Sequence, residues 1–139
     1  MKRIACMAGV LAVFIAGAFV SGKAGAGDDA DSIKAVMQKL HKGADSPLNT
    51  LKAQLKTGSP DWTKVQGESK DLVILGASLA KFAPPRGEAA SYKKLATNYY
   101  NHAKAVDDAA QKQDAAATKA AVTKLSASCK ECHSAHKGQ

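Results

Sequence analysis

The end of the chain, CKECHSAHKGQ, places Cys129, Cys132 and His133 at a spacing that can do chemistry. Two thiols three residues apart with a histidine directly behind them could bind zinc, exchange disulfides or hold a covalently attached haem. On a helix, residues three and four positions apart lie on one face. Two thiols so placed can add to the two vinyl groups along one side of a haem, and the histidine can then bind the iron. The pattern C-x-x-C-H is the signature of c-type haem attachment.

The two alternatives fit the rest of the sequence less well. A closed structural zinc site needs about four ligands, and beyond the motif the chain offers only His41, His102 and His136, with no second C-x-x-C and no H-x-x-x-H. A redox C-x-x-C ordinarily opens a helix that follows a strand. Here the motif closes a predicted helix in a chain without predicted strands, so haem attachment is favoured.

The N-terminal segment indicates the compartment. Two basic residues precede the apolar run of residues 4–20, and Ala24 and Ala26 have the A-x-A spacing of a signal-peptidase site. We predict that residues 1–26 are a cleaved export signal. The alternative is an uncleaved anchor, because the run is slightly shorter than the roughly 20 residues that span a bilayer. Cleavage would leave one domain, residues 27–139, in the periplasm without stable membrane insertion.

Charge and cysteine content narrow the classes of function. The chain has a net charge of +8, and without the three basic residues of the signal 17 basic residues stand against 12 acidic ones, a net +5. These charges are interspersed and no nucleic-acid motif is present, so they predict solvated helix faces. A net positive charge is also compatible with an acidic protein partner. Because Cys6 leaves with the signal, only the motif cysteines remain, and a disulfide-stapled scaffold is excluded.

Apolar periodicity predicts an all-α fold of four helical segments. The first is an arm kinked in the middle, the second and third are long, and the fourth ends in the C-x-x-C-H motif. Capping residues, glycines and prolines mark the boundaries: Gly43, Ser46 and Pro47 within the arm, Ser59 and Pro60 before the second segment, Pro84 and Pro85 after it, Glu88 before the third, and Asp114 before the fourth. Short connections between such segments predict an antiparallel four-helix bundle.

On these residues the chain resembles the class II c-type cytochromes, the cytochrome c prime family and its low-spin relatives. That family consists of exported four-helix bundles with the haem motif near the C-terminus, and its tail reads C-x-x-C-H-x-x-aromatic-Arg/Lys. Lys137 fits the basic position, whereas His136 stands at the aromatic one. The resemblance implies one covalent haem c on Cys129 and Cys132 with His133 as the proximal iron ligand. His136 is then expected to be a polar neighbour of the haem.

The resemblance also implies that the first helix supplies the residue on the other face of the iron. Met37 lies in the corresponding region and is the expected distal ligand. His41, one turn later, is the alternative, and His102 is less favourable because it lies beside the apolar stripe of its helix. Iron bound by His133 and Met37 would be six-coordinate, low-spin and suited to one-electron transfer. A vacant sixth position would instead bind nitric oxide or carbon monoxide.

These inferences predict a periplasmic electron carrier that is not an enzyme. Its partners would be redox proteins, acidic ones among them, and a homodimer through the first two helices, frequent in cytochromes c prime, is a further option. Peroxidase-like turnover would need an open iron and a polar acid or base on the distal side, and only His41 is available for that role.

Overall fold

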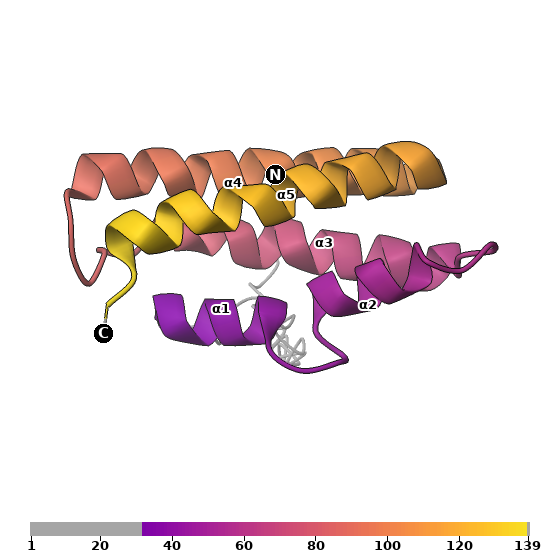
Figure 1. Ribbon diagram of the computed structural model, residues 1–139, viewed down its shortest axis with the longest axis horizontal. Coiled ribbons are helices and arrows are strands. Elements are labelled where there is room, and N and C mark those ends of the chain that lie inside the picture. The colour runs from indigo at the N-terminus through magenta and orange to yellow at the C-terminus, as the bar shows by residue number, and fades with distance from the viewer. Residues whose placement is uncertain (1–31, 139) are drawn as a thin grey trace, which may run out of the picture.

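The computed structural model describes residues 32–138, and the predicted signal of residues 1–26 lies outside them. The described part is built from helices alone, with no strand among its residues (Figure 1). The helices are α1 (Ile33–His41), α2 (Pro47–Gln54), α3 (Trp62–Leu79), α4 (Ala89–Gln111) and α5 (Ala115–His136). The all-α prediction is confirmed, and α1 and α2 are the two halves of the predicted arm.

Helices α1, α3 and α5 begin at a side chain that accepts a hydrogen bond from a free backbone N–H group. Asp114 caps α5 as predicted, since its carboxylate accepts a bond from Ala117 N at 2.9 Å. The prediction of Ser59 and Pro60 at the start of α3 is wrong. Asp61 is the cap, because its Oδ1 accepts from Lys64 N at 3.2 Å. Its own backbone N–H donates to the Gln54 side chain at 3.0 Å, which ties the cap to α2.

The break between α1 and α2 is held by hydrogen bonds to one carbonyl. Gly43 adopts a φ of +89°, a conformation that favours glycine, and so turns the chain out of α1. Its carbonyl oxygen accepts bonds from Ser46 Oγ at 2.9 Å and from Asn49 Nδ2 at 2.8 Å. Pro47 then opens α2, where its missing N–H leaves no bond unmade.

The three long helices run alongside one another, and the arm lies along one side of them (Figure 1). Gln66 near the start of α3 donates to Ala110 O near the end of α4 at 3.3 Å, so these two helices are antiparallel. α4 packs against both α3 and α5. α1 packs against α2 and α3, and within the described part of the chain its backbone does not come as close to α5 as the backbone of α2 does. Thus α5 packs most closely on α4, and of the two halves of the arm only α2 approaches it.

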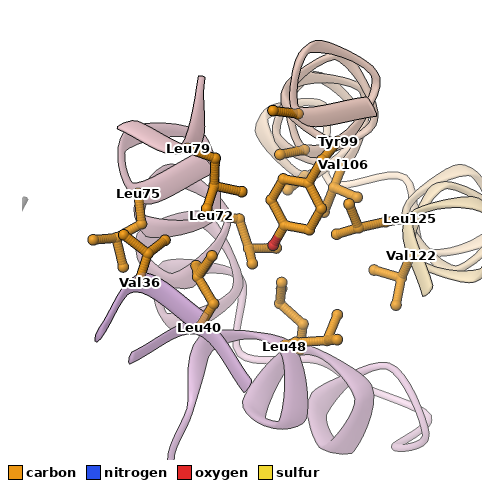
Figure 2. Close-up of a cluster of buried hydrophobic side chains, with 14 of the residues drawn as sticks. Val36, Leu40, Leu48, Leu72, Leu75, Leu79, Tyr99, Val106, Val122 and Leu125 are labelled. Carbon is orange, nitrogen blue, oxygen red and sulfur yellow. The ribbon is translucent and has the colours of Figure 1, made fainter. Parts of the chain in front are cut away.

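One apolar core joins all five helices. The ring of Tyr99 lies in the middle of this cluster, with Leu72 and Leu125 on either side and Leu40 facing them from the arm (Figure 2). On α4 the apolar positions expected to face the core are Tyr92, Leu95, Tyr99, Ala103, Val106 and Ala110. All are buried except Leu95, which is half-buried while its neighbour Ala96 is buried. Among the described residues, no helix combines the length and apolar character needed to cross a membrane.

Candidate functional site

The two motif cysteines lie on the last three turns of α5 as free, half-buried thiols. Cys129 Sγ donates to Leu125 O at 3.6 Å, and Cys132 packs against the core. Burial raises the pKa of both thiols above its usual value, and the Lys52 charge opposes the shift only in part at Cys129. Dithiols that exchange disulfides have a lowered pKa, so these thiols lack the activation that such a reaction needs.

His133 differs from the cysteines because its ring is exposed. Its backbone carbonyl accepts the Lys137 N–H at 3.1 Å in the last turn of α5. The charge of His133 is near enough to lower the pKa of His41 at the end of α1. The imidazole of His133 is therefore exposed on the part of α5 that lies near the end of α1.

The arm carries the two candidates for the distal iron ligand, Met37 and His41. Met37 is half-buried and packs against the core, whereas its neighbours Val36 and Leu40 are fully buried within it. His41 is half-buried, and its Nε2 lies 3.3 Å from the hydroxyl of Tyr99. The two rings meet edge to face, with centroids 6.0 Å apart. One candidate thus makes apolar contacts with the core, and the other is held by a polar contact with α4.

The protonation of the His41–Tyr99 pair follows from its burial. Burial, followed by the charges of His133 and Lys52, lowers the pKa of His41 to about 4. Burial raises the pKa of Tyr99, an effect to which the nearby Cys129 adds. At neutral pH the imidazole is therefore neutral and the phenol keeps its proton. The hydroxyl and His41 Nε2 share one hydrogen bond, so that nitrogen is already in use.

Tyr99 reaches His41 because the residue facing it on α3 is a glycine. A Cβ at Gly76 would lie 3.0 Å from the Tyr99 ring, tighter than ordinary van der Waals contact. The phenol could not have been singled out from the sequence, where Tyr99 is one apolar position of the α4 stripe among several. Its polar role depends on the approach of α1, which no local pattern encodes.

An open groove of about 270 Å³ continues the gap between the arm and α5. Its lining comes from α2, the turn after it, and α5: Lys52, Leu55, Lys56, Lys119, Val122, Thr123 and Ser126. Ser126 lies one turn before Cys129, and its hydroxyl is buried without a hydrogen-bond partner among the described residues. A buried polar atom without a partner is uncommon in a finished fold. The gap, the orphan hydroxyl and the thiol–thiol–imidazole donor set fit a haem held on α5.

The remaining histidines lie elsewhere. His102 is a half-buried residue of α4. His136 is buried and bonded to the loop between α3 and α4 through one ring nitrogen and to Ser91 through the other. Within residues 32–138, no three His, Cys, Asp or Glu side chains are grouped so as to hold a metal ion, so the zinc alternative has no ligand set there.

Comparison with known proteins gives one match. Residues 87–137 match the family model described as Cytochrome C'. Neither the curated proteins nor the solved structures contain a match to this chain. Proteins of the matched family bind covalently attached haem c, serve as electron carriers or gas-binding proteins, and are typically exported. From the loop before α4 to the end of α5, the chain is therefore similar to the cytochrome c' family of class II c-type cytochromes, in agreement with the resemblance stated on its C-terminal motif.

Proposed function

We propose that this protein is a periplasmic one-electron carrier with a single haem c, attached to Cys129 and Cys132 and bound at the iron by His133 and Met37. The observation that carries the proposal is the placement of the donor set. Two half-buried thiols and an exposed imidazole lie on the last turns of α5, and the charge of His133 reaches His41, which follows Met37 by one turn on α1. Haem bound there would supply an iron centre that takes up and releases one electron.

The contacts of the arm favour Met37 over His41 as the distal ligand. His41 Nε2 is hydrogen-bonded to the Tyr99 hydroxyl, and binding iron through that nitrogen would leave a buried phenol unpaired. The Met37 thioether gives up no hydrogen bond when it binds. It also favours ferrous iron relative to a second histidine and closes the sixth position. His41 then serves as a neutral polar neighbour whose orientation is fixed by α4.

Gas binding is the second candidate, and one observation favours it. Met37 packs against the apolar core, as a methionine with no ligand role would. If the thioether stays in the core, the iron keeps a vacant position that nitric oxide or carbon monoxide can occupy. The same residues then hold the haem, and only the coordination on the arm side differs.

The net charge of the chain bears on the partners that we propose for it. The mature chain carries a net positive charge, so acidic redox proteins are the expected partners, and a homodimer through the arm remains an option. No group near Met37 is placed as an acid or base except His41, whose lowered pKa and bond to Tyr99 suit a static role. We therefore propose a carrier and not an enzyme.

The spectrum of the holoprotein and of three variants tests the axial ligand. Ferric wild type should be low-spin with a weak sulfur-to-iron band in the far red, and its ferrous form should bind carbon monoxide slowly or not at all. Met37→Leu keeps the apolar volume and removes the thioether, so it should be high-spin and bind carbon monoxide readily, as should Met37→Ala. His41→Gln is the control and should leave the spectrum unchanged.

Each other outcome identifies a different protein. A wild-type spectrum that is already high-spin would favour the gas-binding candidate. Loss of the low-spin signal in His41→Gln but not in Met37→Leu would make the iron bis-histidine. A haem that leaves the wild-type polypeptide in acid acetone would rule out covalent attachment.

A further inference from the structure

The loop between α3 and α4 is fastened to the end of α5 on the side away from the arm. His136 Nδ1 lies 3.0 Å from Arg86 O, and the Arg86 guanidinium donates to Ser134 O. The hydrogen bonds therefore run in both directions, from α5 to the loop and from the loop to α5. Tyr92 at the start of α4 covers His136 edge-on, with ring centroids 5.6 Å apart.

The partners of His136 determine where its proton lies. A carbonyl oxygen can only accept, so Nδ1 carries the hydrogen that is donated to Arg86 O. Nε2 of the neutral ring then accepts from the Ser91 hydroxyl, 3.2 Å away. His136 is 3 % exposed, and both of its ring nitrogens are satisfied. The imidazole thus fills the place of a buried aromatic ring and adds two directed bonds.

Gly87 makes this approach sterically possible. It has a φ of +78°, and a Cβ there would lie 2.7 Å from His136 Nδ1 and 3.0 Å from Ala135 O. Backbone and ring are therefore packed against each other at a distance that only glycine permits. A second glycine with positive φ, Gly43 at +89°, has nothing within 4 Å of the corresponding position. The chain thus contains its own control for the conformational part of a substitution at Gly87.

We propose that His136 is a positioning residue for the haem-binding turn of α5. His136 follows Cys132 by four residues and His133 by three, so it lies one helical turn beyond them. The ring of His133 is exposed, and what fixes the direction of its imidazole is the backbone of that turn. The bonds of His136 to Arg86 and Ser91 hold this backbone against the loop and α4. This inference rests on the proposed role of His133 as an iron ligand.

Four variants of the holoprotein separate the hydrogen bonds from packing and backbone strain. His136→Leu keeps an apolar side chain and loses both bonds, whereas His136→Asn can still donate to Arg86 O. Gly87→Ala forces the loop away from an intact His136, and Gly43→Ala has a comparable φ without the close contact. The measurements are the ferric electron paramagnetic resonance spectrum, the reduction potential and Tm.

We expect His136→Leu and Gly87→Ala to broaden or double the ferric signal and to shift the potential, because the His133 ring is no longer held in one orientation. Both should also lower Tm by about 5–10 °C, from the loss of two hydrogen bonds in a domain of this size. His136→Asn should restore a single ferric signal in part. Gly43→Ala should lower Tm without changing the ferric signal.

Three outcomes would overturn the proposal. The first is a ferric signal and potential in His136→Leu identical to wild type, which would reduce His136 to packing. The second is the same spectral change in Gly43→Ala as in Gly87→Ala. The third is a lack of any rescue by His136→Asn. Failure of the proposed function is distinguishable, because it would show in the wild type as haem that is not covalent or not bound through His133.

Discussion

The two sides of α5 are built differently. Toward α4, Leu125 is fully buried in the core and His136 is bonded at both ring nitrogens. Toward the arm, the cysteines are half-buried, the ring of His133 is exposed, and within the described part of the chain the backbone of α1 does not come as close to α5 as that of α2 does. The polypeptide completes its own packing on the first side. On the second side it presents the donor set to which we assign the haem.

The largest effect is expected from removing the two cysteines of α5 to which the haem is proposed to attach. Changing both Cys129 and Cys132 to Ala removes every thioether, so no haem should stay with the polypeptide after extraction with acid acetone. Mass spectrometry of the purified chain checks the result. Ser128→Ala, which removes only a hydroxyl bonded to Leu125 O, should retain a full complement of haem. Haem that survives extraction in the double variant would contradict the assignment.

A smaller effect is expected from a substitution on the side of α5 that packs against α4. Leu125→Ala should lower the free energy of unfolding by about 3 kcal/mol, because it leaves a cavity in the core beside Tyr99. Denaturant unfolding checks this value. The control is Ile74→Ala on α3, since the Ile74 side chain is 53 % exposed and its loss should change stability by at most about 0.5 kcal/mol. Equal losses in the two variants would show that the core is not formed as described.

The smallest effect should come from the titration of His41. Its pKa is lowered to about 4 in the fold and is near 6.5 in the unfolded chain, so the unfolded state binds more protons between these values. The contribution of His41 is complete above about pH 6.5 and is lost as the pH falls toward 4. In the haem-free Cys129→Ala, Cys132→Ala chain, Tm should therefore fall over this range.

The matched variants show whether His41 is the source of that slope. Adding His41→Gln to the haem-free chain should make the fall of Tm between pH 6.5 and 4 less steep. The expected reduction is at most the part of the slope that arises from the uptake of one proton on unfolding. His102→Gln, on the outer part of α4, should leave it unchanged. An unchanged slope in the His41 variant would mean that the ring is not buried beside Tyr99.

The helices could be predicted from the sequence because their signals are local. Asp114 caps α5, Pro47 opens α2, and most of the core lies at the apolar positions that the spacing indicated, although some of these, Leu95 among them, are only half-buried. The start of α3 was predicted incorrectly because Ser59 and Asp61 are both good caps. The choice between them depends on the Gln54 side chain, which reaches Asp61 from another helix.

The candidate site shows a similar division. The C-x-x-C-H spacing alone singles out Cys129, Cys132 and His133. The structure then adds that the two thiols are half-buried on α5 and that the imidazole is exposed. The partners of His41 and His136 could not be read in the same way. Tyr99 is 58 positions from His41, and Arg86 is 50 positions from His136. Such pairs exist only after the helices have packed, so periodicity and capping carry no information about them.

The missing side chain of Gly76 has an effect beyond its own helix. The Tyr99 ring lies directly against the α3 backbone at that position, and its far end holds His41. A methyl group at Gly76 would push the ring toward the arm and change the angle at which the phenol meets the imidazole. The size of one residue on α3, a helix that holds none of the proposed haem ligands, therefore sets the geometry of the His41–Tyr99 pair beside the position proposed for the iron. A substitution there would change that pair without changing a proposed ligand.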